Sequence, residues 1–424
     1  MTVRTIKERL YPSLEQEEAM LSVLEECRWL YNFFLGIVKC CIKMPDSELL
    51  QEMIPALCRY RQRLESVHSK TRQYVLYQLY ANIRGLAAKK RRGERGGPLR
   101  FKGRGWYKTF VYNQTGFKII RGPKQTRQMG HLGLSGIGDI PIRLHRSIEG
   151  DIKQVVIKRT AAAKWFAFIQ VERDRPINIA PIDVNKHVGL DMGIMSFVYD
   201  SNGGCVDHPH NFDRLRGKLA DEQRKLMKKQ KHSKNRLKQR VRVAAVHEKI
   251  SNARNDFLHK LSRHYVDGYD VIGMEGLRIQ SLMRGIPNAR NMADASWGRF
   301  FNMLEYKAEN ACSLVVEVPS PYSSVECSRC HRLVPKTLAM RTHCCSYCGL
   351  TINRDHNSAI VIDQRAMRKV GLEESESTPV EMEPLLVSDN EQAWSRKQEL
   401  LQTATGEAHG FHSRSKILEN VPTT

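Results

Sequence analysis

The 424-residue sequence predicts a multidomain α+β protein, and three successive changes of pattern support that prediction. Apolar residues recur at helical spacing through most of residues 11–90, and short runs typical of strands follow in residues 99–171. Beyond residue 184, apolar strand-like runs alternate with longer helical patterns, which is typical of an α/β layer arrangement. A chain of this length can form two or three domains. We therefore expect a helical domain, a small β-barrel and an α/β domain.

The first ninety residues are expected to be mostly helical, after an initial strand in residues 1–10. Pro12 and Ser13 favour the start of a helix, because serine caps the free N–H groups of a first turn. The predicted helical segments begin with an apolar stripe from Leu14 to Ile37, followed by 47–64 and 71–90. The basic and glycine-rich segment 89–98 has the composition of a break between domains.

Residues 99–171 change to short strands and are expected to form the small β-barrel, with strands at 152–157 and 165–171. Aromatic and basic side chains are interleaved near its beginning. Such interleaving suits stacking on bases and contact with phosphates, so Lys102 and Lys108 are candidate nucleic-acid contacts. Ordinary core aromatics of a small barrel explain the same pattern equally well, and this alternative stays open.

Positive charge is concentrated in one segment of a strongly basic chain. The net charge of +23 predicts a polyanionic partner, most simply nucleic acid. Residues 214–249 alone carry +11, within a helical pattern at 212–269 that we interpret as a hairpin. Like charges at helical spacing repel, and an anionic partner would relieve that repulsion. A basic ribosomal or membrane-surface protein is the alternative explanation. The candidate contacts in this hairpin are Lys228, Lys229, Lys231 and Lys234.

The rest of the composition argues against several protein classes. No uninterrupted apolar run approaches ~18 residues, and the N-terminus has no apolar signal core, so neither a membrane span nor secretion is expected. The cysteines outside residues 327–348 lack ligand-like spacing and are interpreted as reduced cytosolic residues. Residues 371–424 hold ten acidic against four basic side chains with few apolar clusters, and are expected to be disordered.

Two closely spaced cysteine pairs predict a zinc ribbon. Cys327 and Cys330 form one C-x-x-C pair, and Cys345 and Cys348 form another after fourteen intervening residues. Two such knuckles place four thiolates around one Zn²⁺. His343 and Cys344 adjoin the second knuckle and are possible competing ligands, although the spacing favours Cys345. A site closed by four sulfurs has no open position, so the zinc is expected to be structural.

Three acidic residues in apolar or helix-start settings suit a metal-dependent nuclease. Asp191 ends one apolar run, Glu275 interrupts another, and Asp355 opens a helical pattern. An unpaired buried carboxylate is costly, so Glu275 in particular needs a cation, a basic partner or a proton. Carboxylates that converge could hold a pair of Mg²⁺ ions for phosphodiester cleavage. Two of the three also have an ordinary explanation: Asp191 ends a strand, and Asp355 caps a helix.

A series of short motifs lies along the chain. They are GLDMG at 189–193, DFLHK at 256–260, GMEGL at 273–277, WGRFF at 297–301, LEYKA at 304–308, the zinc ribbon with RT at 341–342, and NRDHN at 353–357. In their order and spacing, these motifs and the rest of residues 1–370 resemble the TnpB family of transposon-encoded RNA-guided nucleases, relatives of the miniature type V CRISPR effectors.

The resemblance implies a nuclease domain of RuvC type with an RNase H-like fold, in which Asp191, Glu275 and Asp355 bind two Mg²⁺ ions. It also implies a mobile lid at 277–293. The domains that it implies are a wedge β-barrel at 1–10 and 99–178, a helical recognition domain at 11–98, the first part of the nuclease at 184–321, the zinc ribbon at 322–352, the last nuclease helix at 353–370, and the tail at 371–424.

The resemblance further implies the partners. These are a guide RNA, double-stranded target DNA and the displaced single strand, with recognition of a short motif beside the target. Gln73 and Tyr77 are candidates for contacting that motif. A monomer is expected, in the cytoplasm of a prokaryote and associated with the nucleoid. The alternatives are a CRISPR-associated miniature type V effector, an RNA-guided DNA-binding repressor and a transposase, because fold alone does not separate these activities.

Overall fold

The computed structural model describes residues 2–371, except 122–128, 147, 174–181, 194, 209–210, 277–296 and 338–339. The expected lid at 277–293 lies outside the described residues, and so does the expected disordered tail beyond 371. In the described part, no helix combines the length and the apolar composition that crossing a membrane requires.

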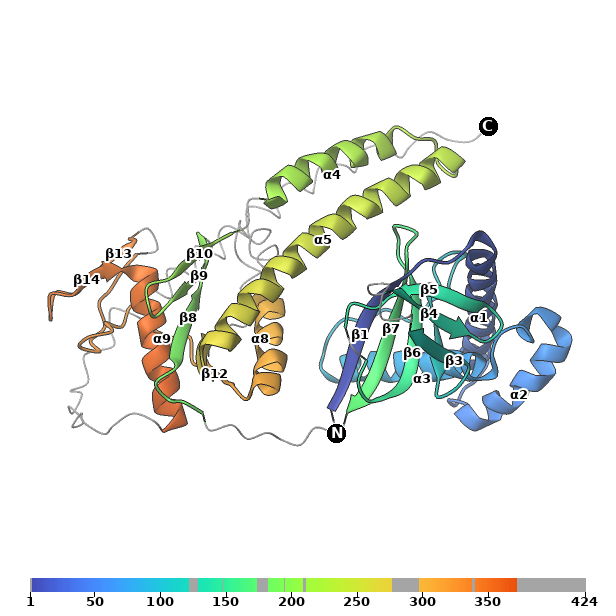
Figure 1. Cartoon of the computed structure of the whole chain (residues 1–424), viewed down its shortest axis with the longest axis horizontal. Helices are drawn as coiled ribbons and strands as arrows, with labels where there is room; N and C mark the ends of the chain where they lie inside the picture. The colour runs from blue at the N-terminus through green and yellow to red at the C-terminus, as the bar shows by residue number, and fades with distance from the viewer. Residues whose placement is uncertain are drawn as a thin grey trace, which may run out of the picture. The chain divides into compact units, whose positions relative to one another are not determined.

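The N-terminal part is a seven-stranded antiparallel sheet, strongly curved into a barrel-like shape (Figure 1). The predicted strand at 1–10 is confirmed, since it pairs along its length with β7 and at its end with β5. The strand order is β2-β6-β7-β1-β5-β4-β3. The strands are β1 (Thr2–Leu10), β2 (Thr109–Asn113), β3 (Phe117–Arg121), β4 (Met129–Leu134), β5 (Gly138–Arg143), β6 (Asp151–Arg159) and β7 (Trp165–Arg173).

The helices of this part are inserted between β1 and β2. They are α1 (Leu14–Cys40), α2 (Ser47–Tyr60) and α3 (Ser69–Arg91), with a short 3₁₀ helix at Gln62–Leu64. Helices α1 and α3 pack against the sheet, and α2 packs on α3. Ser13 caps α1 as predicted: its hydroxyl accepts from the Gln16 N–H, and the Gln16 side chain accepts from the Ser13 N–H. The helices and the barrel share one hydrophobic core, in which Phe34 and Leu76 are fully buried beside Ile157.

The C-terminal part is built on a five-stranded mixed sheet in the order β10-β9-β8-β11-β12. Its strands are β8 (His187–Met192), β9 (Ser196–Asp200), β10 (Cys205–Asp207), β11 (Val271–Glu275) and β12 (Leu314–Val318). Strand β11 lies between β8 and β12 and runs parallel to both. Strand β9 is antiparallel to both of its neighbours, β8 and β10. Its helices are α4 (Asn211–Met227), α5 (Lys234–Gly268), α8 (Trp297–Ala311) and α9 (Arg354–Val370).

Helices cover the two faces of this sheet. Leu190 and Met274 face a core built with α5 and α8, in which Phe300 is fully buried. Val271 and Val316 pack against Ile362 and other apolar residues of α9 on the opposite face. Because side chains alternate along a strand, the odd-numbered residues of β8 and β11 face α9.

Two glycines allow α9 to lie directly on the sheet. A Cβ atom at Gly189 would lie 2.2 Å from the Ala359 carbonyl oxygen, and one at Gly273 would lie 2.7 Å from the Ala366 Cβ. A side chain at either position would push the helix away from β8 or β11.

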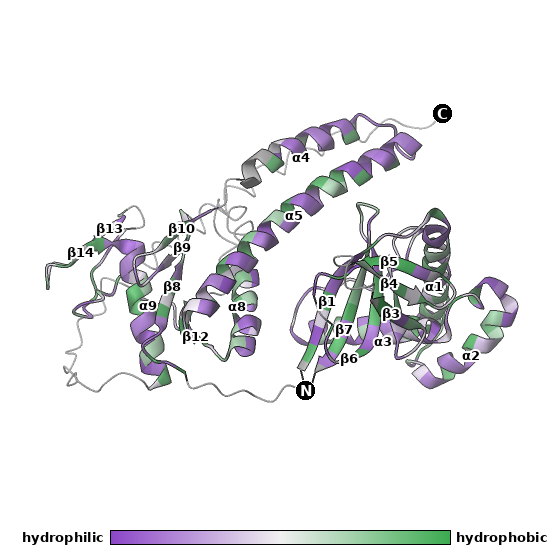
Figure 2. Cartoon of the chain, in the orientation of Figure 1, coloured by the Kyte–Doolittle hydropathy of each residue, from purple (hydrophilic) through white to green (hydrophobic). Residues whose placement is uncertain are grey.

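The predicted basic hairpin is confirmed as α4 and α5, which pack against each other over the outer half of α5. Figure 2 shows this outer half as largely hydrophilic, with green apolar residues where α5 approaches α8. A small hairpin of β13 (Thr342–Cys344) and β14 (Thr351–Asn353) belongs to the cysteine module, and β14 runs directly into α9.

Candidate functional site

The parallel register of β8 and β11 brings two of the three predicted carboxylates side by side. Leu190 is aligned with Met274, so Asp191 and Glu275 occupy the next aligned positions. Neighbouring strands of a sheet lie roughly 4.8 Å apart. Both residues belong to the odd-numbered set that faces α9. Asp191 and Glu275 therefore share one end of one sheet face, although a basic helical hairpin separates them in the sequence.

Helix α9 carries the third carboxylate on the same face of the sheet. The Asn353 side chain caps the helix, because its oxygen accepts from the N–H groups of Asp355 at 2.8 Å and His356 at 3.3 Å. Asp355 is thereby fixed in the first turn of the helix. One turn later, Ser358 is buried, and its interaction with the Asp191 carboxylate lowers the pKa of that group. The first turns of α9 therefore lie beside the end of β8.

The electrostatics of Asp191 reflect this convergence. Burial and then the negative charges of Glu275 and Asp355 raise the pKa of Asp191 to about 8, while Arg354 and Ser358 oppose the rise. Burial also raises the pKa of Glu275, against the opposing effects of Ser323 and Arg365. Negative charge is thus gathered where it is poorly solvated, and a bound cation would stabilise it.

Two arginines surround Asp355. The Arg354 guanidinium donates to Asp355 Oδ1 at 3.1 and 3.0 Å, and Arg341 Nη1 lies 3.9 Å from the other carboxylate oxygen. Arg341 is half exposed, whereas only 15% of the Arg354 side chain is exposed. Arg354 therefore fixes the Asp355 carboxylate, and Arg341 leaves positive charge at the rim of the site.

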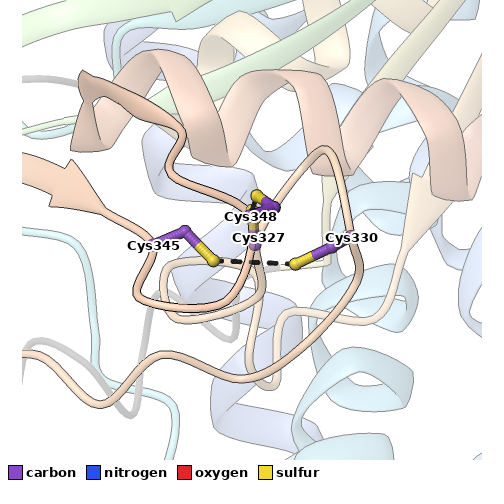
Figure 3. A group of neighbouring side chains, drawn as sticks. All are labelled: Cys327, Cys330, Cys345 and Cys348. Carbon is purple, nitrogen blue, oxygen red and sulfur yellow. Dashed lines mark hydrogen bonds between the residues drawn. The ribbon is translucent and has the colours of Figure 1, made fainter.

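The four predicted zinc ligands form a compact cluster (Figure 3). The sulfur atoms of Cys327 and Cys348 are 3.6 Å apart, as are those of Cys330 and Cys345. Four sulfurs at ~2.3 Å from a tetrahedral zinc ion are ~3.8 Å apart, which closely matches these distances. Burial disfavours the Cys345 thiolate, but N–H groups of Cys348 and Tyr347 bond its sulfur and lower the pKa to about 6.

Within the described part of the chain, these four cysteines are the one group of possible ligand atoms that all lie within 4.8 Å of one another. This group contains Cys345, as the spacing predicted, and neither of the possible competing ligands. Cys344 is exposed on β13, and the His343 side chain contacts Lys336. The carboxylate oxygens of Asp191, Glu275 and Asp355 are less tightly gathered than the sulfurs.

The cysteine module is attached to α9. Buried Asn357 accepts from the Ser328 N–H at 3.0 Å and donates to the Glu326 carbonyl at 2.7 Å. Gln364 donates to the Ser328 carbonyl at 2.9 Å, and Arg365 pairs with the Glu326 carboxylate at 2.6 Å. The first knuckle therefore rests on the helix that presents Asp355.

The predicted nucleic-acid contacts lie on several surfaces. Tyr77 on α3 is 47% exposed and its hydroxyl lies 3.5 Å from Gln51, while neighbouring Gln73 is partly exposed. Lys228, Lys229, Lys231 and Lys234 are all exposed around the turn between α4 and α5. Lys102 lies over the Tyr31 ring, 5.7 Å from its centroid, and Lys108 is exposed and lines a cavity described below. Their roles stay predictions.

Sequence reasoning missed several residues that support the carboxylates. The hydroxyl of Ser323 donates to Glu275, and Ser323 lies in the loop after β12, where the sequence carries no signal for this contact. Ser358 could have been predicted from the sequence, because a residue three positions after Asp355 lies on the same face of a helix.

Three regions of the chain match known protein families. Residues 168–285, which include Asp191 and Glu275, match the family OrfB_IS605, described as "Probable transposase". Residues 297–362, which include the four cysteines and Asp355, match the "Cas12f1-like, TNB domain". Residues 1–40 match the family HTH_OrfB_IS605, described as "Helix-turn-helix domain", although here the structure has the strand β1 followed by the single helix α1.

Individual relatives agree with these matches. A protein of Streptomyces pristinaespiralis described as "Putative RNA-guided DNA endonuclease" is 37% identical over 207 residues, which cover 48% of this chain and 50% of that protein. The Escherichia coli K12 "Putative RNA-guided DNA endonuclease InsQ" is 27% identical over 67% of this chain and 73% of its own length. This chain thus spans half the length of the first relative. A solved structure of the mini-RNA-guided endonuclease CRISPR-Cas_phi3 gives a TM-score of 0.48 at 8% identity, covering 86% of this chain and 92% of that one. The family and relative matches confirm the resemblance to the TnpB family.

Proposed function

We propose that this TnpB-like chain is an RNA-guided DNA endonuclease that cleaves phosphodiester bonds at one site on the α9 face of its mixed sheet. The observation that carries the proposal is the convergence of Asp191, Glu275 and Asp355 from three separate elements. Glu275 and Asp355 are the two charges that, after burial, most raise the pKa of Asp191. Relatives described as RNA-guided DNA endonucleases support the substrate class.

The donor set fits Mg²⁺, which prefers carboxylate oxygens and usually binds through only one or two of them together with substrate phosphates. Asp191 and Asp355 would hold the two ions, and Glu275 would help to hold the second one. Bound Mg²⁺ would activate water and stabilise the departing 3′ oxygen of the cleaved strand. Because the three carboxylates are less tightly gathered than the sulfurs, they would move closer together when the cation and the phosphate bind.

The neighbouring residues have definable roles in this proposal. Ser358 holds the Asp191 carboxylate, and Ser323 holds that of Glu275, so both oxygens are oriented before a cation binds. Arg354 restrains Asp355. Arg341 is half exposed beside Asp355 and supplies positive charge where a strand phosphate would approach.

The cysteine module would act structurally through bound Zn²⁺. Its knuckle at Cys327 is hydrogen-bonded to Asn357 and Gln364 of α9 by way of Ser328. The module would therefore hold the start of α9, and with it Asp355, in register with the sheet.

The partners of this proposal are a guide RNA and a target DNA. The net charge of +23 and the exposed lysines at the α4–α5 turn support polyanion binding, and base pairing with the guide would supply sequence specificity. We propose Gln73 and Tyr77 on α3 as contacts to the motif beside the target, and a monomer as the working state.

The test is guided cleavage by protein purified from cells that carry its native locus, after the RNA that accompanies it has been sequenced. With Mg²⁺, the complex should cut plasmid DNA that matches the RNA. Asp191→Ala should abolish the cut and leave RNA binding unchanged. Binding without cleavage by the unaltered protein would instead favour a repressor, and joining of transposon ends without RNA would favour the transposase named in the family description. A CRISPR effector differs in the source of its RNA, which would then derive from a repeat array.

A further inference from the structure

A cavity in the N-terminal part lies far along the chain from the carboxylates and is lined by basic residues. Its volume is about 290 Å³, near the lower end of the ~300–1,000 Å³ of small-molecule pockets. One wall is the face of α1 with Leu24 and Arg28. The opposite wall is formed by Arg104, Gly105, Tyr107 and Lys108, and by Arg159 at the end of β6, while Trp106 lies on the same loop outside this lining. This size suits one nucleotide better than a helix of nucleic acid.

The loop that forms one wall is fixed in place before any ligand binds. The Asn32 side chain accepts from the Lys102 N–H at 2.7 Å and donates to the Lys102 carbonyl at 2.9 Å, and Arg28 donates to the same carbonyl at 3.0 Å. At the other end, buried Tyr107 donates to Gln78 at 2.8 Å. Gly105 has φ +75°, a conformation that favours glycine. A wall held in this way loses little entropy on binding.

The cavity is lined by more basic side chains than there are acidic groups paired with them. Arg28 pairs with Glu25, the one acidic residue of the lining, with N–O distances of 2.6 and 3.0 Å. In the part of the chain that the structure describes, Arg104 and Lys108 form no ion pair, and both are exposed. Arg159 pairs with Glu17 through Nη2 at 3.2 Å, but its buried Nε has no hydrogen-bond partner among the described residues. The cavity therefore offers unused donors to an anion.

The same loop, residues 102–108, carries an exposed aromatic side chain, that of Trp106. The Trp106 side chain is 72% exposed, and the ring lies close to Gly103, where a Cβ would be 3.2 Å from Trp106 Cδ1. One base stacked on an aromatic ring is worth ~1–3 kcal/mol, and any base can stack. A base inside a duplex already has both faces covered by its neighbours. An exposed indole therefore selects a base that is unpaired and unstacked.

We propose that this cavity, formed by α1, the 102–108 loop and the end of β6, binds one unpaired nucleotide. Its phosphate is held by Arg104 and Lys108, and its base stacks on Trp106. The inference deepens the proposed function, on which it rests for the source of the nucleotide: a bulge or single-stranded segment of the guide RNA, or an unpaired nucleotide of the DNA.

The test measures binding of the full chain, freed of nucleic acid and without Mg²⁺, to labelled oligonucleotides of roughly ten nucleotides, within the span of known single-strand sites. Single-stranded RNA, single-stranded DNA and a DNA duplex are compared. Trp106→Ala should weaken single-strand binding by about 5- to 150-fold, as expected for loss of one stack, and leave duplex binding unchanged. Whether RNA or DNA loses affinity identifies the source.

A second variant tests the phosphate contacts. Arg104→Gln combined with Lys108→Gln should reduce the salt slope of single-strand binding by about 0.7, because the two side chains together neutralise one phosphate. Tyr60→Ala and Arg59→Gln are matched controls, since both residues are exposed on α2 and neither lines the cavity. These controls should bind as the unaltered protein does.

Equal single-strand affinity of Trp106→Ala and the unaltered protein, or an equal loss on duplex DNA, would overturn the proposal. So would a failure of the unaltered chain to bind short single strands. All variants are compared by thermal unfolding, which should be unchanged because the altered side chains are exposed. The assay measures binding without cleavage, so a chain that binds but never cuts would contradict the proposed nuclease and leave the cavity proposal standing.

Discussion

Gly189→Ala is the most informative single substitution that the fold suggests, because it perturbs the position of Asp355 without touching a carboxylate. The added Cβ would lie 2.2 Å from the Ala359 carbonyl oxygen and 2.4 Å from the Asp363 backbone nitrogen. Ordinary contact begins near 3.4 Å, so the backbone of α9 must retreat from β8 by about 1.2 Å. Both close atoms belong to the helix backbone and have no rotamer to change.

The expected result has two parts. Overpacking of this kind destabilises a protein by ~1–3 kcal/mol, and displacement of a catalytic group by ~1 Å costs roughly 100-fold in rate. We therefore expect Gly189→Ala to remain folded, to bind RNA, and to cleave target DNA at least ~100-fold more slowly. Denaturant unfolding measures the first effect, and single-turnover cleavage at saturating Mg²⁺ measures the second.

Gly217→Ala is the matched control. Gly217 lies in α4 with open space around its Cα, so alanine there should stabilise the helix by ~1 kcal/mol and leave cleavage unchanged. Cleavage by Gly189→Ala within about threefold of the unaltered rate, with unchanged stability, would refute the inference that α9 positions Asp355 by packing on Gly189.

Three other outcomes follow from the site. Asp191→Asn should abolish cleavage. The raised pKa of Asp191 makes the folded protein hold more protons than the unfolded chain between pH ~4 and 8, so metal-free stability should fall with rising pH in that window. The variant should show a smaller fall, because only the Asp191 contribution is removed, and unfolding midpoints measured across this pH range would reveal the difference. Cys345→Ser should lower both the zinc content and the cleavage rate, whereas Cys344→Ser should change neither. Loss of zinc with an unchanged cleavage rate would contradict the proposal that the cysteine module positions Asp355. Changing the four exposed lysines at the α4–α5 turn to glutamine should lower the salt slope of nucleic-acid binding by ~0.7–0.9 for each phosphate that the turn no longer neutralises, and an unchanged slope would exclude this turn as a binding surface.

Much of the fold followed from local pattern. The C-x-x-C spacing predicted which four of five neighbouring cysteines cluster, because two knuckles impose their own geometry. The strand at residues 1–10 and the basic hairpin were also evident, since alternation and helical spacing are local properties. The segment predicted as one helix at 47–64 ends at Tyr60, and a 3₁₀ turn completes it at Leu64.

The interactions that complete the site were not accessible in this way. The sequence indicates that Asp191 ends one apolar run and that Glu275 interrupts another, but their proximity depends on the parallel register of β8 and β11. The need for glycine at Gly189 and Gly273 depends on how closely α9 approaches the sheet. Ser323 reaches Glu275 through a loop whose path only the packed structure determines. The cavity beside Trp106 likewise depends on hydrogen bonds between α1 and the 102–108 loop, two separate segments of the chain.

The central claim is that side chains of β8, β11 and α9 form one divalent-cation site. The most direct measurement is a calorimetric titration of Mn²⁺, as a substitute for Mg²⁺, into the protein bound to its RNA and a cleavage-resistant target. The unaltered complex should bind the cation tightly, and Asp191→Asn, Glu275→Gln and Asp355→Asn should each weaken that binding while the complex stays assembled. Undiminished Mn²⁺ binding in all three variants would contradict the claim.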